Sequence, residues 1–301
     1  MATQTDFKIE AELVKKLLDE QFSKLSSMPI KKLGEGLDNT VYLVGEEFVF
    51  RFPRNDSNVP GLMREGNILP KLESIIDLPY PKPVFYGEKS EEYPFPFLGY
   101  PYMRGKFPIG LSDEQRSMSA ETLAQFLRTL HNFPLDKARE LGLLNDARDL
   151  LNIQNRKEYV INHFMDELSL HLEKNDYELL SDYLNQLETG FVQLKEVFLH
   201  GDLHFKNIMV DEAGKISGII DWGDMGIGHP ACDLSAVYSI LPPQARKAFY
   251  KVYGEADEET KVLARFIAVF IAMVLLLQAM EDKDDEVAAE AKATIKRAIS
   301  N

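Results

Sequence analysis

Two stretches of sequence decide the fold: His-Gly-Asp-Leu-His-Phe-Lys-Asn at residues 200–207 and Ile-Ile-Asp-Trp-Gly-Asp at residues 219–224. Short apolar runs typical of strands lie beside them, at 197–199, 208–210 and 217–220. This pattern predicts a small hairpin-like core with Asp202, Asn207 and Asp221 on its loops. We therefore expect these three oxygen-bearing side chains to lie near one another.

The chemistry of these side chains suits a divalent cation and a phosphate. Mg²⁺ takes oxygen ligands and usually keeps several waters, so short Asp and Asn side chains are suitable ligands. A carboxylate at Asp202 that stays clear of the metal could accept a proton from an incoming hydroxyl. Phosphoryl transfer needs such a set, because metal ions neutralise the phosphate charge and a further residue orients the nucleophile.

The chain after about Arg104 has mostly helical periodicity. Its apolar residues recur at three- and four-residue spacing, which is the pattern of amphipathic helices. The expected helices span 120–133, 140–153, 156–173 and 177–194 and, from Pro230 onward, include 263–280 and a tail from Asp285. The strands of the motif region interrupt this series as a small island.

The first hundred residues or so have a different texture. An amphipathic helix is expected over 7–22, and after Pro29 short apolar runs are broken by Gly and Asn. The expected strands are 30–33, 40–44, 48–52, 82–86 and 96–103, with a helix over 62–73. This order predicts an α+β arrangement in which one helix packs on a small antiparallel sheet. We place the boundary between two lobes, 1–103 and 104–301, near Met103.

Together the two motifs resemble those of the antibiotic kinases, the family of aminoglycoside and macrolide phosphotransferases. The resemblance implies a bilobal protein-kinase-like fold. Its small antiparallel-sheet N-lobe would bind nucleotide, and its larger, mostly helical C-lobe would carry the catalytic loop and the acceptor site. The resemblance also implies that Asp202 is the catalytic base. Asn207 and Asp221 would be the magnesium ligands, and His204 would lie near the transferred phosphate.

Upstream elements follow the order of the same family. Gly34 and Gly36 fall in a loop expected between two strands, where the backbone could bring N–H groups to phosphates, although paired glycines there are also typical of a simple turn. Arg51 lies on a strand where family members usually carry Lys, and its partner by motif position is Glu65. Arginine keeps the charge but presents a planar fork. Within the family, an arginine at this position resembles the macrolide branch. It also leaves open an inactive kinase or an ordinary surface ion pair.

Residues 97–105 resemble the hinge that joins the lobes and reads the purine of the nucleotide. Pro101 offers only a carbonyl, and the N–H of Met103 could donate to the purine ring. Because these are backbone contacts, the side chains there do not distinguish ATP from GTP.

Three further polar residues are expected to have structural roles. Asp233 lies in a segment that resembles the family's Asp-Pro-x-x-Asp motif, and by that resemblance it bonds the backbone of the catalytic loop. His131 ends a helix of core-forming Leu and Phe residues. His200 is expected to be a buried, hydrogen-bonded histidine that supports the loop.

The acceptor is less clearly marked. Aminoglycosides are polycations, and the resemblance implies that the site for such an acceptor is lined with carboxylates. The candidates are Asp224, Glu281, Asp282, Asp284 and Asp285. The run 281–286 is more typical of a solvated helix junction. The apolar segment 266–277, with Met273 and Leu276, could wall a site for a hydrophobic macrolide, although a core helix is the simpler interpretation.

The composition limits the possible partners. The 301 residues carry 34 Lys and Arg against 48 Asp and Glu, a net charge of −14 that argues against binding nucleic acid. One cysteine, Cys232, excludes a disulfide framework and a cysteine-based zinc cluster. The longest apolar stretch, 266–277, is too short to span a bilayer, so no membrane is expected as a partner, and no signal peptide is expected at the N-terminus.

These observations predict a monomeric, cytoplasmic enzyme that acts on a small-molecule acceptor. The expected reaction is transfer of the γ-phosphoryl group of ATP or GTP, with Mg²⁺, to a hydroxyl of an aminoglycoside-like antibiotic, as in antibiotic resistance. A macrolide 2′-phosphotransferase is one alternative. A non-catalytic nucleotide-binding module of the same fold is another.

Overall fold

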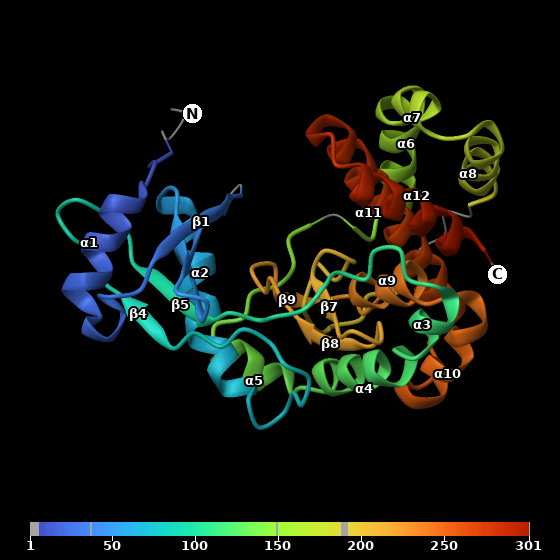
Figure 1. The fold of residues 1–301 in the computed structure, drawn as a ribbon. Coiled ribbons are helices and arrows are strands. Elements are labelled where there is room, and N and C mark those ends of the chain that lie inside the picture. The colour runs from blue at the N-terminus through green and yellow to red at the C-terminus, as the bar shows by residue number, and fades with distance from the viewer. Residues whose placement is uncertain (1–5, 37, 149, 188–191, 301) are drawn as a thin grey trace. The chain divides into compact units, whose positions relative to one another are not determined.

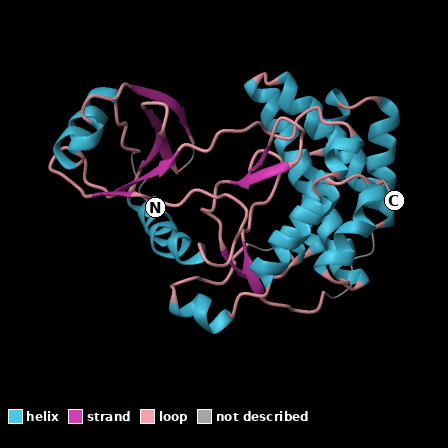
Figure 2. Ribbon diagram, turned by 60° about the horizontal axis from the view of Figure 1, so that its bottom comes forward, coloured by secondary structure: helices cyan, strands magenta, loops and turns pink. Residues whose placement is uncertain are grey.

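The fold is given by a computed structural model that describes residues 6–36, 38–148, 150–187 and 192–300. The chain forms two compact units, Met1–Arg104 and Gly105–Asn301, here called unit 1 and unit 2. Unit 1 contains the larger sheet, whereas most of unit 2 is helical (Figure 2). The chemistry of the motif region belongs to unit 2.

Unit 1 is built on an antiparallel sheet with the strand order β1-β2-β3-β5-β4 (Figure 1). The strands are β1 (Ile30–Glu35), β2 (Asn39–Val44), β3 (Phe48–Pro53), β4 (Phe85–Gly87) and β5 (Phe97–Pro101). Its helices are α1 (Ala11–Gln21) and α2 (Val59–Ile68), with 3₁₀ turns at Ser23–Leu25, Asp56–Asn58 and Leu69–Leu72. The α+β prediction for this part of the chain is confirmed.

Alternation along β3 decides which side chain meets which helix. Phe50 and Phe52 are fully buried in an aromatic core that α1 completes through its apolar positions 14, 17 and 18. Arg51, between these two phenylalanines, lies on the opposite face and contacts Glu65 of α2. Because side chains alternate between the two faces of a strand, Arg51, the one charged residue of β3, faces α2.

The helix predicted over 62–73 is shorter than expected. Helix α2 ends at Ile68, and a 3₁₀ turn follows. The reason is Pro70, which has no N–H to donate to the carbonyl of Gly66, four residues earlier. The hydroxyl of Tyr86 donates to that carbonyl instead, at 2.9 Å.

Unit 2 is largely a set of helices. They are α3 (Asp113–Ser117), α4 (Ala120–His131), α5 (Leu135–Glu140), α6 (Ile153–His163), α7 (Met165–His171), α8 (Lys174–Gln186), α9 (Ala231–Ile240), α10 (Pro243–Tyr253), α11 (Glu258–Asp282) and α12 (Asp285–Ile299). The helix predicted over 156–173 is divided at Phe164 into α6 and α7. Part of the predicted helix 177–194 lies outside the described residues.

Two small antiparallel sheets form the island between these helices. Strand β6 (Val197–Leu199) pairs with β9 (Gly226–Gly228), and β7 (Ile208–Val210) pairs with β8 (Ile216–Ile219). The strand predicted over 217–220 is thus shifted by one residue, and β9 is a strand that the pattern did not indicate. The loop 200–207 connects β6 to β7.

The helix predicted over 140–153 is wrong. Helix α5 ends at Glu140, Gly142 follows with φ +90°, and the chain then runs along the edge of β9. The N–H of Asp146 donates to the carbonyl of Ile227 at 2.7 Å, and the N–H of Ile227 donates to the carbonyl of Leu144 at 2.8 Å. The edge of a sheet offers unpaired backbone groups, and here they outweigh the helical pattern of the sequence.

Helices α9, α11 and α12 pack together in the core of unit 2 (Figure 1). By length and composition α11 could cross a membrane, but 61% of its most apolar window is buried by the rest of the protein. Phe266, Met273 and Leu276 are at most 1% exposed. This apolar segment is therefore a core helix, as the simpler interpretation of the sequence holds.

Candidate active site

One glycine makes the path of the His200–Asn207 loop possible. Gly201 has φ +93°, a left-handed conformation that side chains rarely adopt. A Cβ at this position would lie 2.2 Å from the backbone oxygen of Asp224. Glycine therefore lets the loop pass directly against the segment that follows β8.

A buried carboxylate in the first turn of α9 holds the start of this loop. Asp233 accepts the N–H groups of His200 at 2.8 Å and of Gly201 at 2.9 Å, and Nε2 of His131 lies 3.2 Å away. Burial would raise the pKa of Asp233, but the hydrogen bond and charge of His131 outweigh it and lower this pKa. The structural roles expected for Asp233 and His131 are confirmed by these contacts.

His200 joins the two motifs. Its Nε2 donates to the carbonyl of Ile220 at 3.0 Å, and its Nδ1 accepts the N–H of Asp202 at 3.3 Å. Burial lowers the pKa of this imidazole, which fits a neutral ring with the proton on Nε2. The ring also packs edge-on against the buried Trp222, with centroids 4.8 Å apart. The supporting role expected of His200 is therefore the one observed.

Asp202, His204 and Asn207 form one polar cluster. The amide nitrogen of Asn207 donates to the carbonyl of Asp202 at 2.8 Å and to its Oδ2 at 3.0 Å. Nε2 of His204 lies 3.3 Å from the same Oδ2, while its Nδ1 accepts the N–H of Lys206. The loop thus brings together three of the residues that the sequence singled out.

The carboxylate of Asp202 is ionised at neutral pH. Burial would raise its pKa, but the hydrogen bond and charge of His204, with a smaller contribution from Arg148, hold the pKa below its ordinary value. The side chain is 32% exposed, so a molecule outside the loop can reach it. An ionised carboxylate in this position can accept a hydrogen bond from a hydroxyl group.

Hydrogen bonds of the preceding residue, Ile220, link Asp221 to the same cluster. The N–H of Ile220 donates to the carbonyl of Asn207 at 2.9 Å, and the carbonyl of Ile220 accepts Nε2 of His200. Asp221 itself has φ +61°, an uncommon backbone conformation for a residue with a side chain. Such strain is typical of functional positions that the surrounding structure holds in place.

The oxygen donors of this site fit Mg²⁺. Within the described ranges of the chain, no group of three or more His, Cys, Asp or Glu side chains could hold a metal by itself. Mg²⁺ bound with a nucleotide commonly takes only one or two protein ligands, and waters and phosphate oxygens complete its shell. Asn207 and Asp221 would supply two oxygens, because the hydrogen bonds of Asn207 to Asp202 use its amide nitrogen and not its oxygen.

Arg148 is a residue of this site that the sequence reasoning missed. Residues 140–153, for which the sequence predicts a helix, instead bring Arg148 to the His200–Asn207 loop. Nη2 of Arg148 would lie 3.1 Å from a Cβ on Gly201. Its Nε and Nη2 contact both oxygens of Asp146 at 2.8 and 3.0 Å, and its Nη1 lies 3.4 Å from Asp224. The turn-forming residues of 142–146 were the available signal against a helix there.

Asp224, a candidate for contact with the acceptor, lies beside this arginine. Burial raises its pKa, and the charges of Asp202 and Asp221 act in the same direction, while Arg148 opposes them. The Asp224 side chain is 57% exposed. Its position next to Asp202 makes it the best-placed of the acidic acceptor candidates.

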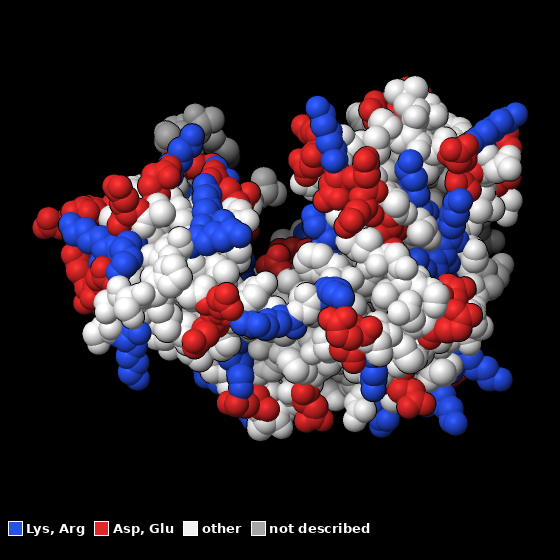
Figure 3. Space-filling view, viewed as in Figure 1, with Lys and Arg blue, Asp and Glu red and all other residues white. Residues whose placement is uncertain are grey.

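The other acidic candidates lie at the junction of α11 and α12, where Asp and Glu side chains gather (Figure 3). Asp284 caps α12 by accepting the N–H of Val287 at 3.1 Å. Lys283, between the two helices, adopts φ +58°. These features are those of a solvated helix junction, the interpretation that the sequence favoured.

In unit 1, Arg51 and Glu65 form a partly buried ion pair. Nη1 of Arg51 lies 2.8 and 2.9 Å from the two carboxylate oxygens of Glu65, and the hydroxyl of Tyr100 donates to the same carboxylate at 3.2 Å. Glu65 is 1% exposed and the Arg51 side chain 20%. The pairing expected from the motif positions is present, and it is not an ordinary surface pair.

The expected glycine loop is only partly present. Gly34 lies within β1, opposite Val41, rather than in a loop, next to an irregularity in the register. Gly36 follows β1 and donates its N–H to the carbonyl of Asn39 at 2.9 Å, closing the turn. A Cβ at Gly34 would meet nothing within 4 Å. Packing within unit 1 therefore does not explain the glycine at this position.

The two expected hinge residues lie at the end of unit 1. Pro101 is the last residue of β5 and pairs with Phe48, and the N–H of Tyr102 donates to the carbonyl of Glu47 at 2.6 Å. Met103 follows and is partly buried. Their backbone roles in reading a purine stay predictions.

Comparison with known proteins identifies relatives of this chain. A model of the phosphotransferase enzyme family matches residues 29–267. Viomycin phosphotransferase of Streptomyces vinaceus is 32% identical over 100 residues, which make up 32% of this chain and 35% of that relative. The matched part is thus about a third of the relative's length.

Solved structures share the fold of the chain. The GDP complex of aminoglycoside 2′-phosphotransferase IIIa matches with a TM-score of 0.70 and 22% identity, over 97% of this chain and 99% of that one. Macrolide 2′-phosphotransferase type I matches with a TM-score of 0.59 and 18% identity, over 97% and 98%. The kinase-like fold is confirmed by these likenesses, and because the family model covers most of the sequence, this chain belongs to the phosphotransferase enzyme family.

Proposed function

We propose that the chain is a small-molecule kinase that transfers the γ-phosphoryl group of ATP or GTP to a hydroxyl of an aminoglycoside-like antibiotic. The observation that carries this proposal is the joining of Asp202, Asn207 and Asp221 through the backbone of Ile220 and the ring of His200. Such an enzyme would act as a monomer in the cytoplasm, where ATP and GTP are both present.

Asp202 would act as the catalytic base. Its carboxylate is ionised and partly exposed, so it can orient the acceptor hydroxyl and take its proton as the phosphoryl group is transferred. His204, which contacts the same carboxylate, would face the transferred phosphate. Asn207 and Asp221 would hold Mg²⁺, which when bound neutralises phosphate charge.

Residues of unit 1 would handle the nucleotide. Arg51, held by Glu65, would contact the phosphates in the place where relatives usually carry Lys. The backbone at Gly34 and Gly36 would approach the phosphates, and the open space at Gly34 is consistent with that role. The carbonyl of Pro101 and the N–H of Met103 would contact the purine.

The acceptor would be recognised by carboxylates. Asp224 is the candidate beside the base, and an acceptor ammonium there would replace part of the charge compensation that Arg148 now supplies. The likeness to aminoglycoside 2′-phosphotransferase IIIa is consistent with an aminoglycoside-like acceptor, and the likeness to macrolide 2′-phosphotransferase type I keeps a macrolide as the alternative.

The experiment is a transfer assay with γ-³²P-labelled ATP and GTP against matched panels of aminoglycosides and macrolides, with and without Mg²⁺. We expect Mg²⁺-dependent labelling of an aminoglycoside, reduced about 10²- to 10⁴-fold in Asp202→Asn. The Asp182→Asn variant, with the same change on the exposed face of α8, serves as control.

Three results contradict the proposal. Labelling of macrolides alone assigns the alternative acceptor, and transfer that persists in Asp202→Asn excludes Asp202 as the base. Binding of nucleotide without transfer to any acceptor would identify a non-catalytic module.

A further inference from the structure

Arg54 holds the backbone of the turn between β1 and β2, here called the glycine turn (residues 34–36 and 38–39). Arg54 is the first residue after β3, and β3 pairs with β2, which begins at the end of this turn. The N–H of Arg54 donates to the carbonyl of Asp38 at 3.0 Å, and its Nη1 donates to the carbonyl of Gly36 at 2.6 Å. One residue therefore fixes two carbonyl groups of the turn.

Two carboxylates compensate the charge of Arg54. Its Nη2 lies 2.8 Å from Oδ2 of Asp6 and 3.2 Å from Oε1 of Glu35. The N–H of Phe7 donates to the carbonyl of Arg54 at 2.6 Å, which places the segment with Asp6 beside the arginine. The Arg54 side chain is only 17% exposed. Arg54 is therefore suited to holding backbone through charge-assisted hydrogen bonds, while Arg51 is the cation for the phosphates.

The connection from β3 to α2 adds a second contact with the glycine turn. Nδ2 of Asn58 donates to Oδ1 of Asp38 at 2.6 Å. Asn58 ends the 3₁₀ turn Asp56–Asn58, and α2, which carries Glu65, follows directly. The segment that joins Arg51 on β3 to its partner Glu65 thus also holds the turn.

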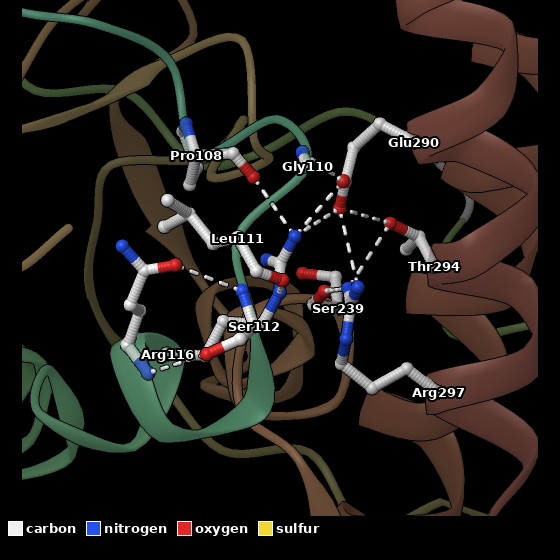
Figure 4. Close-up of polar contacts among 10 residues, drawn as sticks. Pro108, Gly110, Leu111, Ser112, Arg116, Ser239, Glu290, Thr294 and Arg297 are labelled. Atoms are coloured by element: carbon white, nitrogen blue, oxygen red, sulfur yellow. Dashed lines mark hydrogen bonds and ion pairs between the residues drawn. The ribbon is translucent and has the colours of Figure 1, made fainter.

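Unit 2 contains a buried version of this arrangement (Figure 4). Arg116 contacts both oxygens of Glu290 at 2.7 and 2.8 Å and donates to the carbonyls of Pro108 and Leu111. Arg116 is 1% exposed, so there the arginine supports a loop inside the protein. In unit 1 the residues 34–36 beside Arg54 are exposed, so the backbone that this arginine holds is accessible to a ligand.

Holding the turn matters because of its glycines. Glycine has more backbone conformations than other residues, so a ligand that requires one of them loses free energy in ordering the others. An arginine that holds the turn before the ligand arrives reduces this cost, which is preorganisation of the site.

We propose that Arg54 is a positioning residue for the nucleotide: it holds the glycine turn in the conformation that receives the phosphates and does not contact the nucleotide itself. The proposal rests on the proposed function, in which the backbone at Gly34 and Gly36 approaches the phosphates. It adds a residue whose effect on the phosphates is exerted through this backbone.

The test compares nucleotides with nucleosides on the full chain, by titration calorimetry with ATP, GTP, adenosine and guanosine in the presence of Mg²⁺. In Arg54→Gln the Kd of the nucleotide should rise about tenfold, as expected for loss of one charge-assisted hydrogen bond, and the Kd of its nucleoside should be unchanged. In the transfer assay KM for the nucleotide should rise by the same factor, with kcat unchanged. Arg54→Lys keeps the charge but not the fork, so it should recover only part of the loss.

Two further measurements separate this role from general effects. Lys16→Gln removes a cation from an exposed pair with Glu92 in unit 1 and serves as the control. Hydrogen exchange of the free protein needs no nucleotide: the N–H of Gly36, which donates to the carbonyl of Asn39, should exchange faster in Arg54→Gln than in wild type. If Arg54→Gln fails to fold, Arg54→Lys gives the same comparison with a smaller effect.

The outcomes distinguish this proposal from the proposed function. Equal weakening of nucleotide and nucleoside in Arg54→Gln would indicate general damage to unit 1 and overturn the role of Arg54, as would unchanged binding of nucleotide. Full recovery in Arg54→Lys would show that charge alone matters and overturn it too. A wild-type chain that binds neither nucleotide would contradict the proposed function itself.

Discussion

The carboxylate of Asp233 accepts the backbone N–H of Gly201 at 2.9 Å, across 32 residues of sequence. The same carboxylate accepts the N–H of His200, so one side chain in the first turn of α9 holds the two residues that precede Asp202. Gly201 takes its left-handed conformation readily because it has no Cβ, and these contacts fix its place. The position of Asp202 therefore depends on α9 as well as on the hydrogen bonds within the loop.

Asp233→Asn should destabilise unit 2 by about 2–3 kcal/mol, because an amide group presents a donor to N–H groups that need acceptors. Urea unfolding followed by tryptophan fluorescence measures this, since Trp222 packs on His200. Asp182→Asn on the surface of α8 should be neutral. A loss below about 0.5 kcal/mol would show that Asp233 does not hold the loop.

The stability of the protein should fall on acidification from pH 6.5 towards pH 4. Burial lowers the pKa of His229 to about 4, and its Nδ1 accepts the N–H of Ala231, which requires the neutral ring. Between pH 4 and pH 6.5 the unfolded chain binds a proton that the folded chain does not, so stability is present above pH 6.5 and is lost as the pH falls.

The measurement for this pH effect is urea unfolding at pH 7 and pH 5. His229→Gln should reduce the difference in unfolding free energy between the two conditions by about 1–2 kcal/mol. His163→Gln, the same change at an exposed position of α6, is the control. An equal pH dependence in wild type and His229→Gln would contradict the prediction.

Arg148→Gln should lower kcat/KM about 10- to 100-fold, the range expected for loss of a charge-assisted hydrogen bond in a partly buried site. The substitution releases Asp224 and leaves the carboxylates of the site uncompensated. Arg148→Lys should restore part of the loss, because it keeps the charge but not the two-point contact with Asp146.

Steady-state transfer rates test this role of Arg148. Arg139→Gln removes an arginine from an exposed pair with Glu196 and serves as the control. Unchanged kinetics in Arg148→Gln would mean that the arginine only supports the 144–148 segment.

Arg51→Gln should destabilise unit 1 by about 3 kcal/mol, because it leaves Glu65 charged, buried and without its cation. The double variant Arg51→Gln/Glu65→Gln should recover much of that loss, and a double-mutant cycle on urea unfolding gives the coupling. Lys174→Gln with Glu178→Gln, an exposed pair on α8, should show almost no coupling. Additive effects at 51 and 65 would contradict a specific pairing.

The sequence by itself determined the elements whose cause is local. The strand alternation around Arg51, the apolar repeat of α4 and the three oxygen-bearing residues of the motif region could all be recognised from short patterns. Glu65 could be named as the partner of Arg51 because motif order carries that information. The roles of Asp233, His131 and His200 followed from the same motifs.

Only the tertiary structure decided the hydrogen bonds in which a backbone group or side chain distant in sequence takes the place of a local partner. The 142–146 segment follows the edge of β9 because that edge offers hydrogen-bond partners that no pattern within the segment reveals. This pairing brings Arg148 to the site, and Tyr86 likewise takes the carbonyl that Pro70 leaves in α2. The chemistry of the site could thus be predicted from residue types in sequence, whereas its charge balance depends on contacts between residues far apart in the chain.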